Sequence, residues 1–433
     1  NYRNKVYSSG FNGTKNIAPK RIRDFIIFFC NQLDETIYSN RSKNGLFEAY
    51  NTINIHEQNQ TIDIKTLDLM LEGQVAALSS NILSPSEIVL TLESLFSSQL
   101  YRSDMKSFIL YPEKNITPFL EKNIIDPKAL QRSSLLQNMI HEKNSLIIDK
   151  DLEGNYRFNS HFRNNFDLDH ALKRLSEKNP SINIDHDELE IIFDIFESVF
   201  KHRDFTGRSG TMFSYEGIGS IYWHMISKLL LASQECYFLA KRLNNKNDGL
   251  ENDLGSFYYR VRNGLSSAKT PKEYGAFPFD PYSHTPSHSG AQQPGMTGQV
   301  KEEILTRFGE LGCFILNGCI IFDVSLLRYE EFLSKRKTFS YFDTTNTKIN
   351  LSIEKNQLAY TYCQVPIVYT SVKKDSKLKL TFKNGSEKKI EENKIDYKTS
   401  KSIFNREGKI QRIDFYANVE NTYNFSSKNK EKS

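Results

Sequence analysis

The densest group of residues that could carry chemistry lies between 275 and 303, where the chain reads GAFPFDPYSHTPSHSGAQQPGMTGQVKEE. No helical or strand-like hydrophobic spacing runs from 278 to 295, so we expect a long loop there. Loops of this length inside compact domains are usually functional or disordered, and the aromatic and proline content of this one argues for order. The loop leads into a helix predicted to begin near Thr297. Its candidate substrate-binding residues are Asp280, Tyr282, His284, His288, Gln293 and Gln299.

A second polar segment, residues 202–225, reads HRDFTGRSGTMFSYEGIGSIYWHM. Its glycines precede a helix predicted over 216–243, and backbone N–H groups in such a turn can converge on an oxyanion. Arg208, Ser209 and Thr211 would add charge and hydrogen bonds, which favours binding of a phosphate or a sugar hydroxyl. No Lys-Ser or Lys-Thr follows the glycines, so this is not a Walker loop. The alternative is a glycine-rich turn that only caps the helix.

Two carboxylates are the candidate catalytic residues, because cleavage of glycosidic bonds commonly uses two carboxyl groups, or one acid with an external phosphate. Glu216 falls in a first helical turn, where the helix dipole alone would also justify it. Glu302 and Glu303 are adjacent on a helix, so we expect one to point toward the loops and the other to solvent. The three-residue spacing from Gln299 favours Glu302. We therefore predict Glu216 and Glu302 as the catalytic carboxylates.

The histidines and the single tryptophan each have two interpretations. His284 and His288 are four residues apart, but Pro286 between them disfavours a helix and no further ligand lies nearby, so no metal site is expected. Hydrogen bonding to substrate, proton transfer or stabilisation of the loop are the roles left for them. Trp223 could stack on a sugar face, although packing in a core explains it equally well.

Composition excludes several classes of protein. The chain has 433 residues, of which 38% are hydrophobic, and the net charge of +5 is too small and dispersed to indicate a nucleic-acid partner. No apolar run reaches 18 residues, so no membrane span is expected. The five cysteines form no CxxC pair, which predicts reduced thiols and slightly favours the cytoplasm, although the compartment itself stays open. The first residue is Asn1, which suggests that the sequence begins inside a longer gene product.

The periodicity divides the chain at about residue 320. Before it, amphipathic patterns predict about nine helices, the first over 21–37 with its apolar face against a core. The others are predicted at 65–79, 85–98, 129–142, 167–176, 186–202, 216–243, 253–264 and 297–312, with Gly309 and Gly312 closing the last. After it, apolar and polar residues alternate, and Asn384-Gly385 marks a hairpin. We therefore predict a mainly α protein: a helical domain over 1–320, an antiparallel β-sandwich over 321–423 and a disordered tail over 424–433.

The junction between the two predicted domains resembles the (α/α)-toroid carbohydrate-active enzymes, in particular the maltose- and cellobiose-phosphorylase-like glycosidases. In that group a Thr/Gly/Glu-containing loop opens the last toroid helix, and a glycine turn then leads into a strand pair. The segment GMTGQVKEEILTRFGELGCFILNGCIIFD follows this order, and the likeness spans about 200–335. The resemblance implies a toroid-like helical domain. Because fewer than twelve helices are visible, we expect either that it is truncated at its N-terminus or that short helices escape the pattern. It also implies a phosphate loop over Arg208, Ser209, Gly210 and Thr211.

The function implied by the resemblance is acid-assisted cleavage of a glycosidic bond in an oligosaccharide or polysaccharide. The acceptor is water or inorganic phosphate as a co-substrate, and no other cofactor is expected. The general acid of that group lies in the middle of the toroid, and no motif here matches it. This functional hypothesis requires the 202–219 and 278–303 segments to meet at one mouth of the helical domain.

Two other functions fit the same residues. A polysaccharide lyase could use Tyr282, His284 and Arg208 to abstract a proton beside a uronate. A non-catalytic protein could bind glycans through the same loops. A lyase releases an unsaturated product that absorbs in the ultraviolet, whereas a binding protein would keep its ligand when Glu216 and Glu302 are replaced by Gln.

Overall fold

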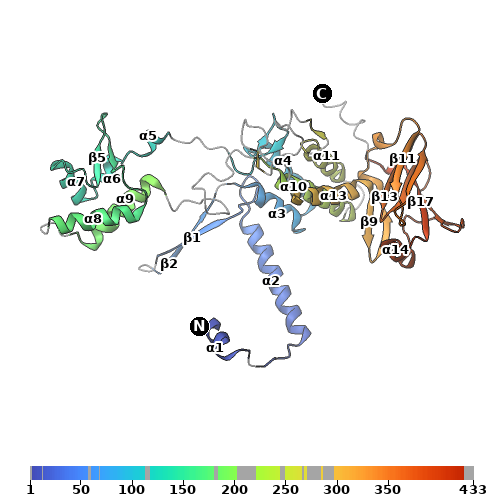
Figure 1. Ribbon diagram of the computed structural model, residues 1–433, viewed down its shortest axis with the longest axis horizontal. Helices are drawn as coiled ribbons and strands as arrows, with labels where there is room; N and C mark the ends of the chain where they lie inside the picture. The colour runs from blue at the N-terminus through green and yellow to red at the C-terminus, as the bar shows by residue number, and fades with distance from the viewer. Residues whose placement is uncertain are drawn as a thin grey trace. The chain divides into compact units, whose positions relative to one another are not determined.

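The computed structural model describes residues 2–11, 13–56, 60–67, 69–112, 118–179, 184–201, 221–243, 249–265, 268–270, 284–285 and 297–423. The chain forms two compact units (Figure 1). Residues Asn1–Pro112 and Gly219–Ser433 make up the main unit, and Glu113–Ile218 make up the inserted unit. The sequence pattern did not single out the inserted unit, because its helices have the same periodicity as those around them.

The helices of the main unit are organised around α10 (Trp223–Leu243), which is buried over most of its circumference. It packs against α3 (Leu71–Ser79), α4 (Pro85–Ser97), α11 (Leu250–Arg262) and α13 (Thr297–Leu311). Leu229, Leu230 and Ala232 of α10 are fully buried at this centre. A helix whose buried residues are spread over most of its faces belongs in a core, which explains the central position of α10. The closed toroid stays a prediction.

Caps define several of these helices. Ser84 accepts from the backbone N–H of Glu87, and the Glu87 side chain accepts from that of Ser84, which forms a capping box at α4. Gly312, with φ +70°, ends α13 in the left-handed region that glycine tolerates. Gly309, also predicted to close this helix, instead lies inside it. An added Cβ there would be 2.0 Å from Oε1 of Gln234, so glycine is needed for close packing against α10.

The N-terminal part departs from prediction in two places. Helix α2 (Pro19–Ser39) forms as expected, but its apolar residues Phe25 and Leu33 are 61% and 59% exposed, so the predicted packing of this face against a core is wrong within the described residues. The helix predicted over 65–79 begins only at Leu71. Before it, the alternation of Ile62 and Ile64 forms strand β2 (Thr61–Thr66), which pairs with β1 (Asn51–His56). A short helix, α1 (Tyr2–Ser9), precedes α2, and the small pair β3 (Tyr101–Arg102) and β4 (Ser107–Phe108) follows α4.

The inserted unit has its own hydrophobic core, to which Leu136, Leu172, Ile192 and Phe196 contribute buried side chains. Its elements are α5 (Phe119–Lys122), α6 (Pro127–Leu130), α7 (Ser134–His141), β5 (Ile148–Lys150), β6 (Tyr156–Phe158), α8 (Asn165–Lys178) and α9 (His186–Phe200). The single helix predicted over 129–142 is divided because Ser133 caps α7 by accepting from the Leu136 N–H. The helices predicted near 167–176 and 186–202 are confirmed as α8 and α9.

The C-terminal β region begins at Cys313, earlier than predicted. Its central sheet has the order β13-β14-β17-β15-β16, and β14 runs parallel to β17, so the prediction of a purely antiparallel fold is wrong. The parallel pair arises because α14 (Tyr397–Phe404) carries the chain across before β17. The Asn384-Gly385 hairpin joins β15 to β16 as predicted, with Gly385 at φ +81°. The predicted tail, 424–433, lies outside the described residues.

The strands and short helices of this region have the following bounds. They are β9 (Cys313–Leu316), β10 (Cys319–Phe322), η2 (Val324–Leu326), η3 (Tyr329–Glu331), β11 (Lys337–Phe342), β12 (Lys348–Ile353), β13 (Gln357–Tyr362), β14 (Val365–Val372), β15 (Lys377–Phe382), β16 (Glu387–Ile390), β17 (Ile410–Asn418) and η4 (Val419–Asn421). Strands β9 and β10 form one separate hairpin, and β11 and β12 form another. The core beneath the sheet includes Ile367, Tyr369, Ile413 and Phe415.

All five cysteines are free thiols, and burial raises the pKa of Cys236 to about 12. Of the helices that the structure describes, none has both the length and the apolar character required to cross a bilayer.

Candidate active site

Two short strands join the segments that the sequence predicts to meet. Strand β7 (Ile221–Tyr222) follows the glycine-rich segment 202–219, and β8 (His284–Thr285) lies within the polar loop. They pair antiparallel, with Tyr222 opposite His284 and Ile221 opposite Thr285. The end of one candidate loop is therefore adjacent to the middle of the other, at the N-terminus of α10.

A buried ionisable pair lies next to these strands. Nε2 of His224 on α10 is 3.5 Å from Oε2 of Glu302 on α13, and the two side chains are 22% and 5% exposed. Neither of these two atoms has a hydrogen-bond partner among the described residues. On its other side the His224 ring is near the Tyr222 hydroxyl, 3.4 Å from Nδ1. Nζ of Lys301 is 3.6 Å from the second oxygen of Glu302.

The exposure and partners of this pair suit proton transfer. A buried polar atom without a partner is costly, and such atoms are often retained for function. A carboxyl group beside an imidazole can hold, donate or accept a proton. The Glu302 carboxylate and the His224 imidazole therefore have the residue types, burial and proximity that an acid–base site requires.

Trp223, the residue between Tyr222 and His224, is fully buried. Nζ of Lys269 lies 5.2 Å from the centre of its ring, a cation–π distance, and the same ammonium donates to the carbonyl of Met105. Burial on this scale favours the core-packing interpretation of Trp223 over stacking on a sugar.

Glu303 also faces inward, so the expectation that one of the two adjacent glutamates points to solvent is wrong. Its side chain is 16% exposed, and Oε2 accepts from Arg262 of α11 at 3.1 Å. The inward sector of α13 is wide enough to include both positions, which are about 100° apart on a helix. Glu302 therefore lies next to His224, and Glu303 is bound by Arg262.

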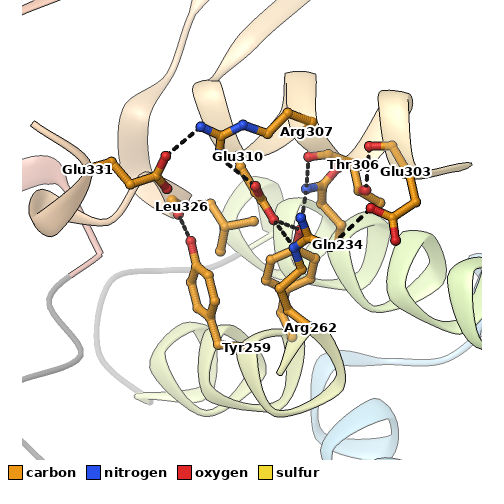
Figure 2. A network of polar contacts seen from close by, with 10 residues as sticks. Gln234, Tyr259, Arg262, Glu303, Thr306, Arg307, Glu310, Leu326 and Glu331 are labelled. Atoms are coloured by element: carbon orange, nitrogen blue, oxygen red, sulfur yellow. Dashed lines mark hydrogen bonds and ion pairs between the residues drawn. The ribbon is translucent and has the colours of Figure 1, made fainter. Parts of the chain in front are cut away.

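Behind the pair, a polar network connects α10, α11 and α13 to η2 and η3 of the β region (Figure 2). Glu310 accepts from Nε of Arg262 at 3.0 Å and from Arg307 at 2.7 Å, and Arg307 also binds Glu331 of η3 at 2.5 Å. Burial acts to lower the pKa of Arg262, but the charges of Glu310 and Glu303 outweigh it and raise the pKa. Every member shown is bound to protein groups, so the network serves to position α13.

Comparison with known proteins identifies the inserted unit rather than this site. Residues 116–203 match the family model described as GH149 phosphorylase insertion domain 2. The matched segment lies within the inserted unit and covers about a fifth of the chain. It supports a glycoside-phosphorylase-like family and a glycan substrate. No curated protein matches the chain.

The matched insertion domain interrupts the main unit immediately before the candidate site. The chain leaves the main unit at Pro112 and re-enters it at Gly219, two residues before β7. The segment that matches the insertion-domain model is therefore continuous in sequence with the glycine-rich segment that was predicted to bind an anion.

Most of the predicted site residues lie outside the described part of the chain. They are Arg208, Ser209, Thr211, Glu216, Asp280, Tyr282, His288 and Gln293. His284 and Gln299 are described through their backbone, in β8 and α13. Glu302 and Trp223 are the two predicted site residues whose side chains are described. Within the described ranges, no three His, Cys, Asp or Glu side chains gather as metal ligands do.

Sequence reasoning missed the partnership of His224 with Glu302. The signal available was the position of His224, one residue after Trp223 at the start of a helix that follows a glycine-rich segment. Its partner is far away in sequence, on α13, and only the packing of α10 on α13 brings them together. The spacing of residues along one helix could not reveal a pair between two helices.

Proposed function

We propose that this chain is part of a glycoside phosphorylase that transfers a glycosyl unit from an oligosaccharide or polysaccharide to inorganic phosphate. The observation that carries the proposal is the match of residues 116–203 to a phosphorylase insertion domain. The pairing of β7 with β8, which joins two polar segments beside a buried His–Glu pair, supports an active site at this place. A toroid-like arrangement of the helices is part of the proposal.

In the proposed reaction, a phosphate oxygen attacks the anomeric carbon and the bond from that carbon to the leaving oxygen breaks. The leaving oxygen takes a proton, which we assign to Glu302, and His224 holds that carboxyl group in place. Phosphate is already an anionic nucleophile, so one general acid suffices and no second carboxylate is needed to activate water. Glu216 is the alternative acid.

The other predicted residues receive binding roles. Arg208, Ser209 and Thr211 would hold the phosphate, because a guanidinium and two hydroxyls beside glycine N–H groups suit a tetrahedral oxyanion. Asp280, Tyr282, His284, His288, Gln293 and Gln299 would contact the sugar. Because β7 follows the first group and β8 interrupts the second, both groups would act on one bound substrate.

The reaction type can be tested by incubating the protein with a panel of oligosaccharides, with and without inorganic phosphate. We expect sugar 1-phosphate to form only when phosphate is present. New reducing ends that appear equally without phosphate would contradict phosphorolysis and indicate hydrolysis. Ultraviolet absorbance from an unsaturated product would indicate a lyase, and no turnover with retained glycan binding would indicate a binding protein.

The role of Glu302 can be tested with Glu302→Gln, which keeps the shape of the side chain and removes the transferable proton. We expect kcat to fall by about 10²–10⁴-fold, the usual contribution of general acid catalysis, with a small change in KM. Glu330→Gln, on the exposed part of η3, is the matched control and should retain full activity. An active Glu302→Gln variant would sink this assignment while leaving phosphorolysis itself standing.

A further inference from the structure

A hollow in the C-terminal β region lies far along the chain from the candidate active site. It has a volume of about 720 Å³ and lies between the end of β15, α14 and the start of β17. That volume is within the range of about 300–1,000 Å³ in which small-molecule sites fall. Phe382 and Ile410 give it an apolar lining. We call this feature the basic hollow.

The charged residues of the basic hollow are four lysines and one glutamate. Lys409 is neutralised by Glu407, with Nζ 2.6 Å from Oε2. Lys383 is near enough to Asp343 to contribute to the lowering of its pKa, after the larger effect of hydrogen bonds from Thr345 and Thr347. The remaining two, Lys398 and Lys401, form no ion pair with any described carboxylate. The hollow therefore has a net positive charge that the fold does not balance.

The stability of α14 does not explain Lys398, and it explains Lys401 only in part. Lys398 is in the first turn of the helix, where the helix dipole disfavours a cation. Lys401 is in the last turn, where the dipole favours a cation, and its Nζ is 6.0 Å from the centre of the Tyr397 ring. It is also three residues after Lys398, so the two ammonium groups are neighbours on one helix face and repel each other. Asp396 already caps this helix by accepting from the Thr399 N–H at 2.9 Å. The residues of α14 that do pack in the core are others, Ser400 and Ile403.

We propose that the basic hollow binds a phosphorylated saccharide that carries at least two negative charges. The ammonium groups of Lys398 and Lys401 would face its phosphates, and Lys383 would add a third positive charge at the rim. The C–H face of the sugar would lie against Phe382, which is half-buried at the end of β15. This site is separate from the one assigned to phosphorolysis and does not depend on that function.

The test is calorimetric titration of the full chain with fructose 1,6-bisphosphate, inorganic tripolyphosphate and glucose. We expect the bisphosphate to bind, glucose not to bind, and affinity to fall as salt rises. The double variant Lys398→Ala/Lys401→Ala should bind the bisphosphate at least about tenfold more weakly. The control variant Lys355→Ala/Lys389→Ala removes the same charge from exposed positions outside the hollow and should bind like the wild type.

Three results would overturn the proposal. Unchanged binding by the Lys398→Ala/Lys401→Ala variant would place the ligand elsewhere, including at the candidate active site. An equal loss in the control would show attraction to overall charge rather than to this hollow. Equal affinity for tripolyphosphate and the bisphosphate would remove the saccharide from the proposal. Circular dichroism of each variant checks that the β region remains folded, so that a loss of binding reports on the site.

Discussion

Glu310 illustrates how single side chains hold the helices of the main unit together. With its side chain 4% exposed, it accepts from two guanidinium groups and from the Tyr258 hydroxyl at 2.6 Å. Burial, and then the charge of Glu310, raises the pKa of Tyr258 well above its ordinary value, so the phenol stays a neutral donor. A buried carboxylate is tolerated only when it is paired in this way. The geometry of α13, and with it the position of Glu302, depends on these contacts.

At Gly309 the fold has no room for a side chain. We expect Gly309→Ala to lower the free energy of unfolding by about 1–2 kcal/mol, because overpacking outweighs the gain of roughly 1 kcal/mol in helix propensity. Gln234 cannot move aside freely, since its Nε2 donates to the Thr306 carbonyl at 2.8 Å. Chemical denaturation measures the loss. In a Gln234→Ala background the same glycine substitution should no longer destabilise, and a loss there equal to that in the wild type would contradict the clash.

Asp323 provides a prediction about pH. Burial acts to raise the pKa of its carboxyl group, but Lys241, at 2.7 Å, outweighs burial and the pKa is lowered. The pKa of this carboxyl group is therefore lower in the folded chain than in the unfolded chain, where it is about 4. Its ionised form stabilises the fold at pH values above the unfolded pKa, and this stabilisation is lost as pH falls through the folded pKa. We expect Asp323→Asn to lower the free energy of unfolding by about 1 kcal/mol at pH 7 and by less below about pH 4.

Denaturation curves at several pH values would measure this difference. Glu391→Gln, which removes an exposed partner of Lys377, is the control and should leave stability nearly unchanged at every pH. A cost for Asp323→Asn that is the same at pH 3 and pH 7 would refute the electrostatic explanation.

Among the elements, the N-terminus of α7 is held from outside its own helix. Glu188 of α9 accepts from the Leu135 N–H at 2.9 Å and from the Ser134 hydroxyl at 3.2 Å. A carboxylate at this end of a helix satisfies free N–H groups and complements the helix dipole. The contact therefore fixes the angle between two helices of the inserted unit as well as the start of one of them.

Glu188→Ala should loosen α7 without unfolding the rest of the unit. We expect a local loss of about 1–3 kcal/mol, because the buried Leu135 N–H loses its acceptor. Hydrogen exchange followed by mass spectrometry would show faster exchange in α7 than in α8. Glu190→Ala is the control, since Glu190 has only a distant contact with His186, at 3.7 Å. Unchanged exchange in α7 would show that Ser133 alone suffices as the cap.

The elements also show what the sequence could predict. Helix α4 was predictable because Ser84-Pro85 and Glu87 are local signals for a helix start, and the β15–β16 hairpin was predictable from Asn384-Gly385. The parallel pairing of β14 with β17 was not, because it depends on where α14 returns the chain. The burial of α2 was wrongly predicted because amphipathic spacing reports that a face is apolar and not what covers it. For the candidate site, spacing selected Glu302, but pairing it with His224 required the packing of two helices.

At the scale of the whole molecule, the inserted unit should fold without the main unit. Its buried core comes entirely from its own residues, and a chain of about 100 residues is of ordinary domain size. We expect residues 113–218, expressed alone, to show helical circular dichroism and a cooperative thermal transition. As a control, Phe196→Ala in that fragment should lower the temperature of the transition strongly, because Phe196 is buried in this core. A fragment without a cooperative transition would mean that the unit needs the main unit to fold.

The pairing of β7 with β8 has one more consequence. Each strand has two residues, so a very short antiparallel pair joins two parts of the chain that are about 60 residues apart in sequence. We expect changes of loop length on the far side of these strands to leave the packing of α10 on α13 intact, because that packing is made by the two helices themselves. Under the proposed function, substrate preference would then vary with loop length while Glu302 keeps its position on α13.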